Sequence, residues 1–473
     1  MLILSLAIIA PTGALAEGPG GNPPQEGQGV PQGGPGDRPE GAAPGDMPGN
    51  MPGDMPGGAP EGVPGGMSAS FTYTAATEIV SAATLADGEY LSSNTDESAL
   101  IINTTESVAI LNPTVTKTGD SNGGDNCNFY GLNAAVLAMG GADVTITGGT
   151  ITSDADGANG VFSYGGNGGR NGAAGDGTTV TISDTTIVTT GDGSGGIMTT
   201  GGGVTYAYGL SVTTGGRSSA AIRTDRGGGT VYVDGGDYTS NGLGSPAIYS
   251  TANITVENAT LVSNLAEGVC IEGMNTITLT NCDLTANNTQ CNGNATFLDT
   301  IMIYQSMSGD ADSGTSAFTM TGGSLTSKSG HVFHVTNTHA IITLTGVEVT
   351  NEDDENILLS VCDDGWSGAS NTAELYADAQ ALEGNILVGG NSKLTLTLAN
   401  GSSLTGSISG NIANSKGTVI STEMGAVSVS LDDTSTWTLT GDNYITEFSG
   451  NAQQIISNGY TLFVNGIALE GTN

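Results

Sequence analysis

The sequence predicts an all-β fold, a right-handed parallel β-helix, on three observations. Short runs alternate apolar, often β-branched, residues with polar ones at a period of two. The runs recur every 23 to 26 residues where nothing is inserted, a period typical of solenoids. Turns rich in Gly and Asn separate them, and Gly fills 77 of 473 positions, a composition that disfavours helical repeats.

Nine copies of the pattern define the expected coils. They start at Val108, Val144, Val180, Thr205, Val231, Ile254, Ile277, Phe318 and Ile342, with longer steps where a polar loop such as 165–177 is inserted. The first and third residues of each copy should stack inside as apolar ladders, at about 4.8 Å per coil. Asn258 and Asn281 share one turn position, and an amide ladder facing inward is expected there.

The chain divides into four expected segments. Residues 1–16 have the apolar run and Ala14-Leu15-Ala16 cleavage site of a signal peptide, which predicts a secreted, extracellular or surface-associated protein. The apolar run is too short to span a bilayer, so no stable membrane insertion is expected. Residues 17–67 are rich in Gly, Pro and Met and predict a disordered linker. The β-helix is expected over 68–375, and irregular coils and a cap of the same solenoid over 376–473.

Composition excludes one class of partner. The chain has 47 Asp and Glu against 9 Lys and Arg, a formal net charge of −38. Nucleic-acid binding needs clustered basic residues to neutralise phosphates, so it is not expected. Five cysteines show no CxxC spacing, and only Cys282 and Cys291, on either side of an inserted loop, suggest a bridge.

A row of side chains on the second run of each coil is the candidate ligand-binding site. With the first residue of each run pointing inward, the outer row contains Phe162, Arg223, Tyr249 and Tyr304, with Asp225 beside it. Exposed rings stack on sugar faces while polar groups bond hydroxyls, which predicts a polysaccharide or glycan ligand. The alternatives are a loop that covers these rings and an internal ion pair between arginine and Asp225.

The first run carries Thr-x-Thr pairs on its expected outer face. Examples are Thr278/Thr280 and Thr319/Thr321, and Tyr206, Tyr232, Asp234 and Glu257 interrupt the columns. Those interruptions rule out a flat ice-binding lattice. Threonine is common on exposed strands, and no further role is assigned to the pairs.

A short acidic segment suggests a bound calcium ion as a cofactor. Asp310 and Asp312 have the close spacing of oxygen ligands that Ca²⁺ prefers, so a calcium site is predicted there. The alternative is a solvated turn, because no EF-hand glutamate follows. The chain has no GxSxG, HExxH or P-loop motif, and no catalytic residue is predicted.

Several segments resemble one group of proteins: NFYGLNAA (128–135), AAIRTDRGGGTV (220–231), SPAIYSTA (245–252) and MIYQSMSGDAD (302–312). Over roughly residues 80–473 the chain looks like secreted, adhesin-like or carbohydrate-binding parallel β-helix proteins of anaerobic bacteria. More distantly it is similar to clostridial β-helix proteins that bind cellulose and pectic acid with Ca²⁺, and to pectate lyases and polygalacturonases, the pectin-lyase-like fold. Asp363-Asp364 lacks the flanking residues of the polygalacturonase motif, so the resemblance implies no catalytic residue.

These observations predict a secreted, non-catalytic protein that binds a polysaccharide or host glycan. One alternative is a calcium-dependent lyase or hydrolase acting on uronate polymers, with Arg223 as the base. A second alternative is a structural surface spacer without a ligand.

Overall fold

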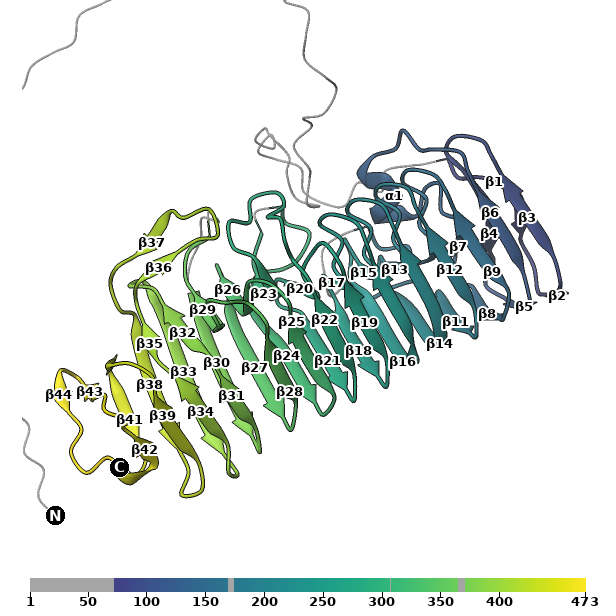
Figure 1. The fold of residues 1–473 in the computed structure, drawn as a ribbon. Helices are drawn as coiled ribbons and strands as arrows, with labels where there is room; N and C mark the ends of the chain where they lie inside the picture. The colour runs from purple at the N-terminus through teal and green to yellow at the C-terminus, as the bar shows by residue number, and fades with distance from the viewer. Residues whose placement is uncertain (1–71, 169–173, 307, 365–370) are drawn as a thin grey trace, which may run out of the picture. The chain divides into compact units, whose positions relative to one another are not determined.

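A computed structural model describes residues 72–168, 174–306, 308–364 and 371–473. The predicted signal peptide and linker lie outside the described residues. The described chain is a parallel β-helix, as predicted, in which successive coils stack their strands into long parallel sheets (Figure 1).

Sheet A forms one face of the helix and is parallel throughout. Its strands, in order, are β1 (Thr74–Ile79), β4 (Glu97–Asn103), β7 (Val136–Met139), β10 (Val161–Tyr164), β13 (Ile197–Thr200), β15 (Ile222–Thr224), β17 (Ile248–Ser250), β20 (Val269–Glu272), β23 (Asp299–Tyr304), β26 (His331–Thr336), β29 (Ile357–Val361), β32 (Asn385–Val388) and β35 (Ile408–Ser409).

Face B1 is formed by the first run of each coil. Its strands are β2 (Ala83–Ala86), β5 (Ser107–Leu111), β8 (Asp143–Thr147), β11 (Thr179–Ser183), the first halves of β14 (Gly203–Thr214) and β16 (Gly229–Ser240), β18 (Asn253–Glu257), β21 (Thr276–Thr280), β24 (Thr315–Thr321), β27 (His339–Thr345), β30 (Asn371–Asp378), β33 (Ser392–Ala399), β38 (Ala426–Leu431) and β41 (Glu447–Ser449).

Face B2 follows B1 after a tight turn. It contains β3 (Glu89–Ser92), β6 (Thr114–Lys117), β9 (Thr150–Ser153), β12 (Thr186–Thr189), the second halves of β14 and β16, β19 (Thr260–Ser263), β22 (Asp283–Ala286), β25 (Ser324–Ser327) and β28 (Glu348–Asn351). A separate parallel sheet follows, of β31 (Ala381–Glu383), β34 (Ser403–Gly406), β39 (Thr436–Leu439) and β42 (Ile455–Ile456).

The remaining elements lie outside these faces. They are the helix α1 (Asp125–Tyr130), the antiparallel pair β36 (Ile412–Ala413) and β37 (Val419–Ser421), and the C-terminal elements β40 (Asn443–Ile445), η1 (Ala452–Gln454), β43 (Leu462–Val464) and β44 (Ile467–Ala468). The helix α1 was not predicted, because the repeat pattern does not include it. The other elements lie within residues 376–473, where irregular coils and a cap were expected.

The predicted coil register is confirmed on face B1. Val144 pairs with Val180, and Ile254 pairs with Ile277. These residues belong to one continuous apolar core that runs along the stack. The same inner column continues beyond residue 375, where Leu375 pairs with Leu396.

The turn between B1 and B2 differs from expectation. Asn258 and Asn281 are exposed and have left-handed φ values of 55° and 52°. Asn258 Nδ2 donates to Asp234 Oδ1 at 2.7 Å, on the outside of the coil. The predicted inward amide ladder is therefore wrong, because asparagine is used here for its tolerance of left-handed backbone.

Inserted loops cover the outer face of sheet A. Thr200 on β13 donates a hydrogen bond to the carbonyl of Phe129 in α1 at 2.8 Å. The ring of Phe297 stacks on His334 of β26 with centroids 4.5 Å apart. Three apolar clusters form between sheet and loops, so the protein has a second buried layer outside the solenoid core.

All five cysteines are unpaired, so Cys282 and Cys291 do not form the suggested bridge. Four of the thiols are buried, and Cys291 is half-buried. Among the described residues, no helix combines the length and apolar character needed to cross a membrane.

Candidate functional site

The predicted row of exposed side chains is buried. Phe162 and Asp225 are 0% exposed, Tyr304 1%, Arg223 2% and Tyr249 3%. The expectation of an open row is wrong, because the inserted loops pack over this face of sheet A. These five residues therefore belong to the second buried layer, and no glycan reaches them in this conformation.

The row also has a different register at one strand. Phe162, Arg223 and Tyr249 do share a column, through successive pairings of β10, β13, β15 and β17. The next members are Cys270 and Met302, whereas Tyr304 pairs with Glu272 in the neighbouring column. Ile301, instead of Ile303, pairs with Val269, so β23 is shifted by two residues after the insertion that precedes it, and sequence spacing does not reveal this.

Arg223 and Asp225 meet as an internal ion pair. The guanidinium Nη2 lies 2.8 Å from Asp225 Oδ2, and Nη1 donates to the carbonyl of Ser218 at 2.9 Å. The guanidinium also lies 5.5 Å from the centroid of the Tyr249 ring. Burial raises the pKa of Asp225 to about 7, against the opposing effect of the arginine. The structure therefore shows the internal ion pair that the sequence analysis gave as an alternative to ligand binding.

Glu272 accepts hydrogen bonds from several hydroxyl groups. Its carboxylate accepts hydrogen bonds from Tyr249 Oη at 2.6 Å, from Tyr304 Oη at 3.2 Å and from the hydroxyl of Ser306. Burial raises the pKa of this carboxyl, and the hydroxyl donors oppose the rise. The two tyrosines predicted to bind ligand are thus engaged with Glu272.

Asp310 is also engaged. Its Oδ1 accepts Arg226 Nε at 2.9 Å, and its side chain is almost fully buried, whereas Asp312 is half-buried. In the described part of the chain, no group of three or more His, Cys, Asp and Glu side chains is arranged to hold a metal ion. Calcium binding at Asp310 and Asp312 stays a prediction.

A second set of acids lies further along the same layer. Asp299 and Glu267 are buried, with Asp364 near both, and burial raises the pKa of Asp299 well above its usual range. His334 points outward from sheet A into this set, with Nε2 3.5 Å from Asp364 Oδ2. All four of these side chains are buried.

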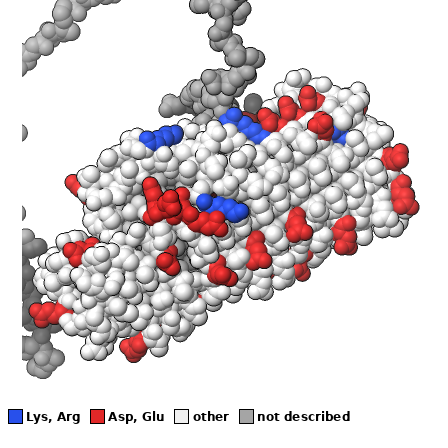
Figure 2. Space-filling model, in the orientation of Figure 1, with Lys and Arg blue, Asp and Glu red and all other residues white. Residues whose placement is uncertain are grey.

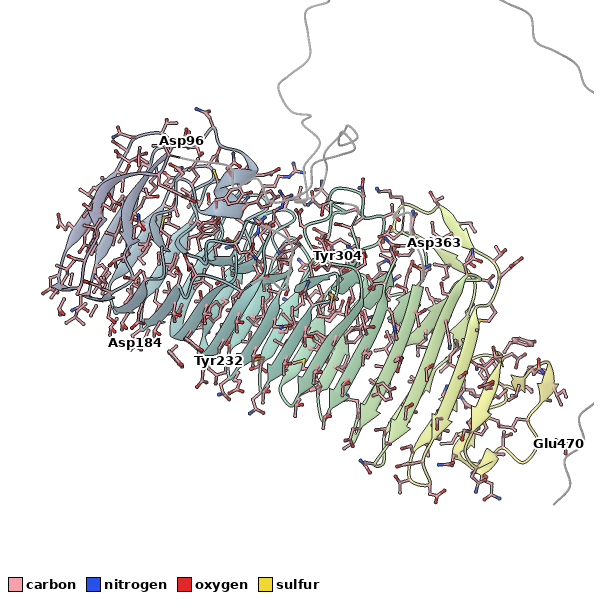
Figure 3. All side chains as sticks on the ribbon, turned by 180° about the vertical axis from the view of Figure 1, so that it is seen from behind. Asp96, Asp184, Tyr232, Tyr304, Asp363 and Glu470 are labelled. Atoms are coloured by element: carbon pink, nitrogen blue, oxygen red, sulfur yellow. The ribbon has the colours of Figure 1, made fainter. Side chains whose placement is uncertain are left out.

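Exposed aromatic residues lie instead on face B1. Tyr206 and Tyr208 project from β14 and Tyr232 from β16, with Tyr206 and Tyr208 each 38% exposed. The ring centroid of Tyr232 lies 6.4 Å from that of Tyr206 and 6.2 Å from that of Tyr208. We call these three residues the tyrosine cluster. Figure 3 shows Tyr232 on the side of the strand stack opposite to Tyr304 and the loops.

Carboxylates border the tyrosine cluster. Tyr232 Oη donates to Glu257 Oε2 at 3.0 Å, a bond that raises the pKa of the phenol. Asp234 pairs with Tyr208 across the strands and lies beside Glu257 in the next coil. In the view of Figure 2, acidic side chains are spread over the surface and few basic ones appear. The cluster thus combines apolar rings with hydrogen-bond acceptors in a negative environment.

The sequence contained the signal for this cluster. Tyr206 and Tyr232 occupy an outward position of two adjacent copies, and both were noted only as interruptions of the threonine columns. Since the first and third residues of each copy point inward, the residue between them must point outward. The repeat does not reveal that loops cover the outer face of the second run, and this is why the prediction fell on the second run instead of the first.

The fold and the cluster define a parallel β-solenoid protein with an exposed aromatic patch on one sheet and a buried polar layer on another. Comparison with known proteins gives no matching family model, no matching curated protein and no matching solved structure.

Proposed function

We propose that this protein is a secreted, non-catalytic carbohydrate-binding β-helix, whose ligand is a neutral polysaccharide or host glycan. The observation that carries the proposal is the tyrosine cluster. Three rings on two adjacent strands of a parallel sheet, with Tyr232 inclined by 56° to Tyr206 and by 58° to Tyr208, present apolar faces onto which sugars can stack. Hydroxyl and carboxylate groups around the rings can bond sugar hydroxyls.

The charge favours a neutral ligand. Glu257 and Asp234 border the rings, and the whole chain carries a formal charge of −38. A uronate polymer would meet like charges at the cluster, which costs binding energy. This electrostatic environment also weighs against the alternative of an enzyme acting on uronates.

The position of Arg223 supports a non-catalytic protein. As a base it would need to reach a substrate, but its guanidinium is buried and held by Asp225 and the Ser218 carbonyl. The resemblance to secreted adhesin-like β-helix proteins, and the signal peptide expected at residues 1–16, are consistent with a protein that binds glycans outside the cell.

Retention of the purified chain on insoluble glycans tests the proposal. Cellulose, chitin and mannan serve as neutral probes, mucin as a host glycan, and cross-linked polygalacturonate as the anionic comparison. We expect retention on at least one of the neutral probes or on mucin, and a loss of about tenfold or more in affinity for the double variant Tyr206→Ala, Tyr232→Ala, since each ring contributes about 0.5–1.5 kcal/mol beyond its buried area. Repeating the assay with a calcium chelator tests the calcium prediction separately.

Tyr444→Ala is the matched control. Tyr444 is 54% exposed and stacks on Phe463 at 4.7 Å, outside the tyrosine cluster, so its loss should leave retention unchanged. Unsaturated products from polygalacturonate would contradict the non-catalytic proposal. If the protein binds none of the probes, the spacer alternative is favoured.

A further inference from the structure

The outward column that contains Tyr206 and Tyr232 continues along face B1. The strand pairings place Tyr232, Thr255, Thr278, Thr319, Thr343 and Tyr376 in one line, one residue per coil. The four threonines are half-buried, so each is partly exposed to solvent, and Tyr376 is 36% exposed. We call this line the hydroxyl track.

The hydroxyl track has a regular spacing. Neighbouring strands lie about 4.8 Å apart, so the five steps from Tyr232 to Tyr376 cover about 24 Å. Between the two tyrosines each coil offers the same groups, a threonine hydroxyl and methyl. Such a surface suits a linear polymer of similar units that lies across the strands, along the direction in which the coils stack.

The track continues to a cleft at its C-terminal end. Beyond Tyr376 the column passes through Thr397 and Ser430 to Ser449 on β41, the last strand of the face. Here a cleft of about 530 Å³ opens, within the range of small-ligand sites. Its lining is rich in hydroxyl groups, which come from Thr395, Ser428, Ser430, Thr446 and Ser449.

We propose that the hydroxyl track binds one extended, linear, neutral glycan chain along the stacking direction, from the tyrosine cluster toward the C-terminal cleft. The inference rests on the proposed function and adds the shape and orientation of the ligand. Rings at Tyr232 and Tyr376 bind sugar faces at two separated points. Threonine hydroxyls between them exchange hydrogen bonds with the sugar hydroxyls.

The acids beside the track again select a neutral chain. Glu374 lies two residues before Tyr376, where it accepts hydrogen bonds from Tyr376 Oη at 2.5 Å and from His339 Nε2 at 2.8 Å. Asp378 follows in the column that also contains Asp234 and Glu257. Carboxylates therefore border the track near both of its tyrosine ends.

The test uses soluble cello-, manno- and xylo-oligosaccharides of increasing length, with affinity measured by calorimetry on the full chain. We expect affinity for the matching series to rise over several sugar units and then level off. Thr278→Val with Thr319→Val removes two hydroxyls at nearly constant shape. This pair should weaken binding of the long oligosaccharides about tenfold, while binding of the shortest ones stays unchanged.

A matched control lies on the neighbouring face. Thr285 and Thr326 pair across β22 and β25 on face B2, in adjacent coils, just as Thr278 and Thr319 pair on B1. Thr285→Val with Thr326→Val should leave affinity unchanged at every length. Tyr376→Ala should lower affinity several-fold for the long oligosaccharides alone.

The outcomes separate this inference from the proposed function. If binding depends on Tyr206 and Tyr232 but does not rise with length, the extended track is wrong and the glycan-binding proposal stands. If the B1 and B2 threonine pairs have equal effects, the track is equally contradicted. If no glycan is retained in any assay, both proposals fail.

Discussion

Asp299 lies in the second buried layer, and neither of its carboxylate oxygens has a hydrogen-bond partner in the described structure. Glu267 and Asp364 are its acidic neighbours, and burial is the main cause of its raised pKa. A carboxyl whose pKa is higher in the folded than in the unfolded state stabilises the fold when it is protonated. Its contribution is complete below the unfolded pKa and is lost as the pH rises through the folded pKa.

Asp299→Asn should therefore stabilise the protein at alkaline pH. The amide cannot ionise, so we expect the free energy of unfolding to rise by about 1–3 kcal/mol at about pH 8, with a smaller difference at about pH 5. Thermal melts across this range measure it. Asp433→Asn, at an exposed acid, is the control and should have little effect. A variant that is less stable than wild type at alkaline pH would show that the ionised form is required.

Two tyrosines allow a matched comparison of burial. Tyr249 Oη donates to Glu272 in the buried layer, and Tyr376 Oη donates to Glu374 on the exposed face. Tyr249→Phe should cost about 1–3 kcal/mol of unfolding free energy, because it leaves a buried acceptor short of a donor, whereas Tyr376→Phe should cost almost nothing.

Glycan retention of the same variants gives a second measurement. Tyr249→Phe should bind glycans like wild type once folded, since Tyr249 lies in the covered layer. Reduced binding by a fully folded Tyr249→Phe protein would mean that Tyr249 takes part in glycan binding.

At the scale of single elements, the turn between B1 and B2 sets the coil shape. Asn281 adopts φ of 52° there and is exposed. Asn281→Gly should be nearly neutral, because glycine enters this region freely. Asn281→Val should lower the free energy of unfolding by about 1–2 kcal/mol, since a branched side chain opposes left-handed backbone. Equal effects of the two variants in denaturant melts would mean that the amide contacts matter more than the backbone.

The strands of B1 could be predicted from the sequence because their signal is local. Alternation at Val144, Val180 and Ile254 places the inner column directly, and the glycine and asparagine turns mark where each strand ends. The same rule places Tyr206 and Tyr232 outside, so the tyrosine cluster was within reach of sequence reasoning.

The covering loops could not be predicted in the same way. Phe129 reaches Thr200, and Phe297 reaches His334, through insertions without a repeat. Whether an insertion folds back over sheet A or extends into solvent depends on contacts distant in sequence. The burial of Arg223, Tyr249 and Tyr304 under these loops, and the register of β23 after its insertion, are therefore not encoded in the repeat.

At the scale of the whole stack, each coil contacts mainly the coil before and the coil after it. The inner column illustrates this, with pairings from Val231 to Ile254 and from Ile254 to Ile277. Stability in such an array is a sum of coil terms and nearest-neighbour terms. The second layer adds contacts that reach further, such as Thr200 to Phe129, 71 positions apart in the sequence.

The direction of the strand-to-strand hydrogen bonds has a mechanical consequence. In Figure 1, β1 and β44 lie at opposite ends of the stack, so tension between these ends acts along the hydrogen bonds and opens them one coil at a time. Pulling between handles at Val80 and Ile467 in an optical trap should give a series of small ruptures. Each uninterrupted coil, such as Val231 to Ile254, would release about 80 Å of chain. A single rupture releasing the whole stack would mean that the covering loops bind the coils into one mechanical unit. A protein that unfolds in steps dissipates mechanical work at each coil while the remaining coils stay folded.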